Sequence, residues 1–304
     1  MLVNLMIVAA VAYAVYRLFP EPLFNFAVRM QRRAAGLVLK ETMVDEHRVP
    51  YLEGGRGEPL LLLHGFGAEK DHWSQVAKFL TPHFRVIAPD LPGFGESSRI
   101  PDARYDLEHK LDRIGKFATA VGISKFHLGG NSMGGYLAAM YAARAPDQVQ
   151  TLWLLAPAGV AGAEQSELLQ MIARGDNLLL VDSEVTGKRL AGMLFGKAPF
   201  VPEAFNRVWR QRAMRNREFN AKIFTELFSQ PITLEERISG LATPAYIVWG
   251  DDDRMLHVSG AQALKLLLPN AQVRIMPYMG HCPMIERPRD TAVDFLNYHR
   301  RAIE

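Results

Sequence analysis

A single pentapeptide constrains this chain more than any other part of its sequence. Residues 130–134 have the pattern G-x-S-x-G around Ser132, and they follow an apolar run at 125–129 and precede a helical pattern. In this strand–turn–helix context the motif is typical of a nucleophile elbow. The flanking residues must be small, because a side chain there would strike the neighbouring strand or helix. The pattern therefore predicts a serine held at the carboxyl edge of a parallel sheet, with a helix N-terminus behind it.

A serine hydroxyl needs help to act as a nucleophile near neutral pH: a base, an acid that orients the base, and donors for an oxyanion. His281 is the candidate base, because it lies in a loop between a strand-like run and the final helical pattern. The candidate acids are Asp251, Asp252 and Asp253, which follow another predicted strand. Charge chemistry does not choose among three adjacent aspartates. One is expected to orient the histidine, and the other two to be solvated turn residues.

The oxyanion donors are expected from the segment H-G-F-G at residues 64–67, which follows a short apolar strand. Its glycines let the backbone turn amides toward a substrate carbonyl, and the N–H groups of Phe66 and Met133 form the expected pair. His64 is interpreted as a structural residue beneath this loop. The sequence has no metal-binding or phosphate-binding motif, so neither a metal nor a cofactor is predicted. The only cysteine, Cys282, is interpreted as a buried bystander.

Five segments together resemble the signature motifs of the α/β-hydrolase family, whose chain order Ser, Asp, His is also found here. They are residues 63–67, 88–97, 130–135, 249–253 and 280–283. In that family the acid usually stands three residues after the glycine of the W-G-D-D-D segment, which implies Asp253. Residues 257–261 and 284–288 narrow the resemblance to membrane-anchored monoacylglycerol lipases and, more closely, bacterial membrane-bound phospholipases A.

The chain beyond residue 40 alternates short apolar strands with helical patterns. This alternation favours an α/β fold with a mostly parallel sheet and helices on both faces. Residues 160–240 break the rhythm, because they contain helical patterns and no convincing strand. We predict that they form a helical cap, or lid, inserted into an α/β-hydrolase core of residues 41–159 and 241–304. Its apolar residues are expected to hold the cap together and partly to line an acyl-chain pocket: Leu178, Leu179, Leu180, Leu190, Met193, Leu194, Phe195, Phe200 and Phe205.

A basic run in the predicted cap has two interpretations. It consists of Arg207, Arg210, Arg212, Arg215 and Arg217. The run is either a solvated helix face or a clamp for lipid phosphate. The formal net charge of the whole chain is only +3, and no dense basic tract predicts a nucleic-acid partner.

The N-terminal segment, residues 1–40, is predicted to attach the protein to a membrane. Residues 1–16 carry no charge, and with the next apolar residues they just span a bilayer if Arg17 snorkels. No basic residue precedes the apolar run, which disfavours a cleaved signal peptide, and a hydrolase core needs no buried helix there. Residues 23–39 are predicted as an amphipathic juxtamembrane helix with Arg29, Arg32 and Arg33 near anionic headgroups, or else as a soluble stalk.

The membrane implied by the resemblance is a bacterial inner membrane, reached through this single N-terminal helix. The charges after the anchor favour a cytoplasmic catalytic domain by the positive-inside rule, although a short span with few charges can insert either way. The alanines at positions 9, 10, 12 and 14 would allow a homodimer through the anchor.

The predicted function is a membrane-anchored serine carboxylic-ester hydrolase that releases fatty acids from glycerophospholipids or lysophospholipids. The alternative is a monoacylglycerol lipase or general esterase. A carbon–carbon hydrolase of ring-cleavage products shares the sequence around G-N-S-M-G-G, but those enzymes are soluble. A non-enzymatic binding protein usually lacks a member of the catalytic triad, and no member is missing here. The fold alone does not fix the substrate.

Overall fold

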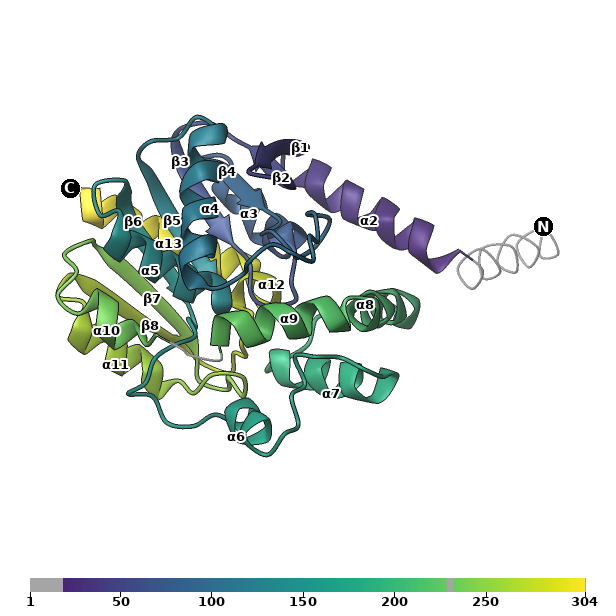
Figure 1. The fold of residues 1–304 in the computed structure, drawn as a ribbon. Helices are drawn as coiled ribbons and strands as arrows, with labels where there is room; N and C mark the ends of the chain where they lie inside the picture. The colour runs from purple at the N-terminus through teal and green to yellow at the C-terminus, as the bar shows by residue number, and fades with distance from the viewer. Residues whose placement is uncertain (1–18, 229–231, 304) are drawn as a thin grey trace, which may run out of the picture.

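The structure is a computed structural model, and it describes residues 19–228 and 232–303 of the chain. Its centre is an eight-stranded sheet with the order β1-β2-β4-β3-β5-β6-β7-β8 (Figure 1). The outer pairs β1–β2 and β2–β4 are antiparallel, and the other neighbouring pairs are parallel. The predicted mostly parallel sheet is therefore confirmed. The strands are β1 Leu37–Val44, β2 His47–Gly54, β3 Glu58–Leu63, β4 Phe84–Pro89, β5 Phe126–Asn131, β6 Val149–Leu155, β7 Ala245–Gly250 and β8 Ala271–Met276.

Helices cover both faces of this sheet, because the strands are apolar on both sides. In β3, Leu61 and Leu63 face one core while Leu60 and Leu62 face the other, as the alternation of side chains in a strand requires. Burying each of these leucines contributes about 1.5–3 kcal/mol. The first core includes α4 Leu107–Ala120, α5 Met133–Arg144 and α11 Ser259–Leu267. The second includes α3 Ser74–Leu80, α12 Pro283–Glu286 and α13 Pro288–Ile303; the 3-10 turn η1 Lys70–Trp73 leads into α3.

Between β6 and β7, the described residues form five helices. They are α6 Glu167–Ala173, α7 Glu184–Leu194, α8 Glu203–Arg215, α9 Arg217–Phe228 and α10 Leu234–Ile238. Figure 1 shows α7, α8 and α9 gathered outside the sheet on one side of the molecule. Side chains of α6, α7, α8 and the loop before α7 form a small core with Met255, and this core includes Leu178, Leu190 and Met193.

The N-terminal helix α2 Pro20–Ala34 projects from the sheet and packs against α8 (Figure 1). The prediction of a helix over residues 23–39 is wrong at its end: Gly36 has a φ of +67°, and Leu37 already pairs with Gly54 in the sheet. Within residues 19–228 and 232–303, no helix combines the length and apolar character needed to cross a membrane. Residues 1–18 of the predicted anchor, with the alanines of the predicted dimer contact, lie outside the described residues.

Candidate active site

Ser132 stands on a tight turn between β5 and α5. Its backbone has φ 57° and ψ −119°, a conformation that residues with a Cβ atom rarely adopt. The turn is crowded: a Cβ on Gly130 would lie 2.2 Å from the Gly134 carbonyl oxygen, and one on Gly134 would lie 2.0 Å from that of Leu63. A strained backbone conformation persists only where the surrounding structure enforces it, and here the crowded turn holds Ser132 in that conformation at the end of the strand.

His281 and Asp253 meet beside this turn. The Nδ1 atom of His281 lies 2.7 Å from Oδ2 of Asp253, and both side chains are buried. The other carboxylate oxygen, Oδ1, accepts hydrogen bonds from the N–H groups of Met255 at 2.8 Å and Leu256 at 3.0 Å. Two backbone donors and an imidazole thus fix the orientation of the Asp253 carboxylate.

The two neighbouring aspartates do not share this position. Asp251 and Asp252 are exposed. Of the three aspartates that the sequence left open, the one brought to His281 is Asp253, which is the residue that the resemblance implies.

Asn131 connects the serine turn to the histidine loop. Its buried side-chain amide donates to the carbonyl oxygens of Leu155 at 3.1 Å and His281 at 3.0 Å. The backbone N–H of His281 in turn donates to the Leu194 carbonyl of α7 at 2.8 Å. The histidine loop is therefore held from the sheet on one side and from the inserted helices on the other.

The glycine-rich segment after β3 lies against Ser132. A Cβ on Gly65 would be 3.4 Å from the Ser132 Cβ, and Phe66 lines the same cavity as Ser132. Met133 is the first residue of α5, so its N–H has no acceptor within the helix. Phe66 and Met133, which carry the two predicted donor groups, thus line the same cavity as Ser132.

His64 has the structural role that was predicted for it. It is fully buried, its Nδ1–H donates to the Gly65 carbonyl at 2.7 Å, and its Nε2 accepts from the Leu91 N–H at 3.0 Å. Burial lowers the pKa of His64 to about 3, so the ring is neutral. Cys282 is also buried, and burial raises the pKa of its thiol, which keeps it in the unreactive protonated form.

Ser132 and His281 open into one large cavity of about 1340 Å³. Its wall is mostly apolar, and much of it comes from the helices between β6 and β7. Of the apolar residues singled out in the sequence, those on the wall are Leu179, Leu190, Leu194, Phe195, Phe200 and Phe205, whereas Leu178 and Met193 pack in the small core.

One face of α2 also lines this cavity, which the sequence analysis did not foresee. The residues are Phe24, Ala27, Val28 and Gln31. Their spacing of i, i+3, i+4 and i+7 is the signal that could have identified an inward face. Further contacts fix α2 in place: Arg32 forms two hydrogen bonds of 2.6 Å to Asp71. Of the three arginines expected near headgroups, Arg32 is therefore engaged within the protein.

Glu69 is a polar group of the cavity wall that was also missed. It stands two residues after the glycine-rich segment 64–67 and lines the cavity. Burial, assisted by the carboxylates of Asp90 and Asp71, raises the pKa of Glu69 to about 7. Near neutral pH its carboxyl group can therefore donate as well as accept a hydrogen bond.

The basic run, which lies on α8 except for Arg217 at the start of α9, is not a uniformly solvated face. Arg210 is 3% exposed and forms 2.5 Å hydrogen bonds to Glu184 and Glu203. Arg212 binds Glu21 and Asn25 of α2. The first interpretation is therefore wrong for Arg210, because these internal partners satisfy its guanidinium. These ion pairs also occupy the guanidinium groups of Arg210 and Arg212, which a phosphate clamp would need.

Comparison with known proteins gives consistent similarities. A family model described as the α/β hydrolase fold matches residues 58–288. Lipase 1 of Psychrobacter immobilis is 34% identical over 275 residues, covering 88% of this chain and 86% of the relative. A monoacylglycerol lipase of Homo sapiens is 30% identical, covering 93% and 89%.

A solved structure extends this similarity over the whole chain. It is described as a membrane phospholipase A and bacterial virulence factor. It is 40% identical with a TM-score of 0.92, and it covers 100% of this chain and 98% of that one. The predicted resemblance is confirmed, and with it the prediction of a hydrolase of the lipase and esterase class.

Proposed function

The chain belongs to the α/β-hydrolase family, and from this premise we propose that it is a membrane-associated phospholipase A. In this proposal it releases fatty acids from glycerophospholipids or lysophospholipids, with Ser132 as nucleophile, His281 as base and Asp253 as the acid that orients it. The observation that carries the proposal is the buried Asp253–His281 pair, 2.7 Å apart, whose histidine lines the same cavity as Ser132.

The proposed reaction has two halves. Ser132 Oγ gives its proton to His281 Nε2 and attacks the ester carbonyl, while the N–H groups of Phe66 and Met133 stabilise the oxyanion. His281 then protonates the leaving alcohol, and a water activated by the same histidine releases the fatty acid from the serine. Asp253 stabilises the imidazolium through both halves. The neutral His64 beneath the glycine-rich loop supports this loop without entering the proton transfers.

A lipid substrate is supported by the size and polarity of the cavity. Binding sites for small molecules are typically about 300–1000 Å³, and the cavity of about 1340 Å³ exceeds this range. Its apolar wall suits acyl chains, whose burial is favourable in proportion to their area. The phospholipid assignment follows the similarity to a membrane phospholipase A over the full chain.

Membrane association and the lid belong to the same proposal. We propose that the apolar beginning of the predicted segment 1–40 is the membrane anchor. It precedes α2 in the sequence, and α2 lines the cavity at Phe24 and Val28. A lipid entering beside α2 would reach Ser132 without crossing bulk water. Residues 160–240 would act as the lid, and the bond from the His281 N–H to the Leu194 carbonyl supports a coupling between lid position and the base.

Monoacylglycerol lipase activity is the second candidate. It is favoured by the relatives of that name at 30–32% identity. It is also favoured by the pairing of Arg210 and Arg212 with acidic residues of the protein, since a substrate without phosphate needs no arginine clamp.

The test is fatty-acid release by detergent-purified full-length protein from diacyl phospholipid, lysophospholipid and monoacylglycerol. Ser132→Ala is the control and should fold normally. We expect release from the phospholipids that is absent in the variant. Release from monoacylglycerol alone would assign the second candidate. Turnover by Ser132→Ala above a trace would remove Ser132 as the nucleophile, and absence of labelling of the wild type by a fluorophosphonate would contradict an activated serine.

A further inference from the structure

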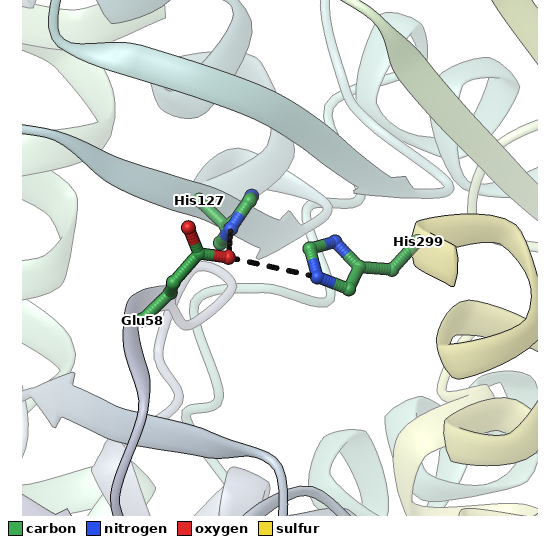
Figure 2. A group of neighbouring side chains, drawn as sticks. All are labelled: Glu58, His127 and His299. Carbon is green, nitrogen blue, oxygen red and sulfur yellow. Dashed lines mark hydrogen bonds and ion pairs between the residues drawn. The ribbon is translucent and has the colours of Figure 1, made fainter. Parts of the chain in front are cut away.

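Two imidazoles and one carboxylate converge far from the cavity, at the opposite ends of the strands. Figure 2 shows Glu58 from the start of β3, His127 from the start of β5 and His299 from α13 pointing toward one another. Their three ligand atoms all lie within 4.8 Å of one another. None of the three residues lines the cavity beside Ser132.

The separations of these atoms are close to those of a metal site. Nε2 of His127 lies 3.1 Å from Oε2 of Glu58, and Nε2 of His299 lies 3.7 Å from the same oxygen. In a tetrahedral zinc site with bonds of about 2.0–2.1 Å, ligand atoms are roughly 3.3 Å apart. The two observed separations lie on either side of this value, so small side-chain movements would bring the atoms into range.

The donor set also fits a divalent transition metal. His127 and His299 each offer an imidazole nitrogen, and Glu58 offers a carboxylate oxygen. Two imidazoles and one carboxylate form a ligand set typical of zinc and of iron(II).

Thr151 supplies the outer hydrogen bond that a metal-binding histidine requires. Its buried Oγ1 lies 2.8 Å from Nδ1 of His127. When Nε2 faces only the Glu58 carboxylate it carries the ring proton, and Nδ1 accepts from the threonine hydroxyl. With a metal on Nε2, the ring proton resides on Nδ1 and is donated to the Thr151 oxygen, which can act in either role.

The exposure of the three side chains provides rigidity together with access. His127 is 1% exposed and fixed in the sheet, His299 is 13% exposed, and Glu58 is 52% exposed. An ion can therefore enter from the Glu58 side, where water can complete the coordination. In addition, Nδ1 of His299 has no hydrogen-bond partner among the described residues. This imidazole is instead held by packing against the rings of Phe84 and His127, with ring centroids 4.8 and 4.6 Å apart.

We propose that Glu58, His127 and His299 form a structural binding site for a divalent transition-metal ion of the zinc class. The ion ties the final helix α13 to the first residues of β3 and β5. It takes no part in ester hydrolysis, since the site lies at the other end of β5 from Ser132.

The experiment uses full-length protein in detergent, stripped with a chelator and then titrated with Zn²⁺ alone. Zinc retained after gel filtration and the zinc-induced shift in unfolding temperature are measured together. We expect one zinc ion per chain and a rise in unfolding temperature. Removing an outer partner of a metal ligand typically costs roughly 10- to 100-fold in affinity, so we expect a loss in this range for Thr151→Val. The loss should exceed about 100-fold for Glu58→Gln and His299→Gln.

The matched control is His83→Gln, which removes an exposed histidine next to Phe84 and outside the cluster. It should bind zinc as the wild type does. Each variant is compared with its own zinc-free form, so a loss of stability alone does not imitate loss of binding. Absence of retained zinc in the wild type would overturn the proposal. Equal zinc binding by the wild type, Glu58→Gln and His299→Gln would overturn it as well, because the ion would then bind elsewhere.

Discussion

The amide of Asn131 donates a 3.0 Å hydrogen bond to the carbonyl oxygen of His281, a residue 150 positions further along the chain. Asn131 precedes Ser132 directly, so this bond joins the turn of the proposed nucleophile to the loop of the proposed base. The same amide also donates to Leu155 at the end of β6. One buried side chain thus links the two loops directly.

The first prediction concerns this link. Asn131→Ala leaves the buried His281 carbonyl without its donor, whereas the Leu155 carbonyl keeps the bond from the Ser132 N–H. We expect a loss of about 1–3 kcal/mol in the free energy of unfolding. We also expect kcat to fall by roughly tenfold with KM unchanged, since a small displacement of the base affects the reacting geometry and not substrate binding. Steady-state kinetics and urea unfolding measure the two effects, and an unchanged kcat in a destabilised variant would contradict the positioning role.

The second prediction separates the three aspartates. In Asp253→Asn, the N–H groups of Met255 and Leu256 still require an acceptor, so the amide oxygen stays with them and the NH₂ group faces His281. Nδ1 must then accept, the ring proton moves to Nε2, and the histidine can no longer take the proton of Ser132. We expect kcat to fall on the order of 10³- to 10⁴-fold.

The exposed neighbours provide matched controls for this prediction. Asp251→Asn and Asp252→Asn should change kcat by no more than about twofold, as surface substitutions do. Equal losses at all three positions, or the largest loss at Asp252, would overturn the assignment of Asp253.

Much of the fold could be predicted because local pattern and tertiary environment agree there. Strand β3 carries leucines on both of its faces, and both faces are buried. The small residues around Ser132 predicted a crowded turn, and the close approach of Gly134 to the Leu63 carbonyl shows why no side chain fits. A residue predicts structure reliably where only one physical reason accounts for its type, as for the small residues of this turn.

The wrong or undecided predictions concern residues whose position depends on partners that the local sequence does not reveal. Val38 and Leu39 fall within the predicted amphipathic helix of residues 23–39, but they belong to an edge strand and are 60% and 46% exposed. The burial of Arg210 depends on Glu184 and Glu203, one of which is on another helix. Charge alone could not choose among the aspartates, since the hydrogen bonds that orient Asp253 come from backbone groups of the following turn.

The third prediction tests the contribution of α2 to substrate binding. Ala27 lines the cavity, and Ala27→Trp would fill part of the space that an acyl chain needs. We expect hydrolysis of long-chain esters to fall roughly 10- to 200-fold in kcat/KM, with little change for a short-chain ester. Phe26→Trp is the control, because Phe26 is on the same helix and 61% exposed. A uniform loss for all chain lengths would indicate damage to the reacting groups and not to the acyl-chain site.

The last prediction concerns stability at acidic pH. Burial lowers the pKa of His64 from 6.5 to about 3 in the folded protein. As the pH falls through about 6.5, the unfolded chain binds a proton at this histidine and the folded chain does not, so acid favours unfolding. This residue alone should reduce the free energy of unfolding by about 2 kcal/mol between pH 7 and pH 5. Chemical unfolding at a series of pH values measures the effect.

His64→Asn should be less stable at pH 7 because it loses one of the two bonds to Gly65 and Leu91, yet its stability should depend less steeply on pH. The exposed His83→Asn should keep the wild-type slope. If His64→Asn kept that slope as well, the acid sensitivity would have to arise from other histidines such as His72, whose pKa is lowered to about 4 by desolvation.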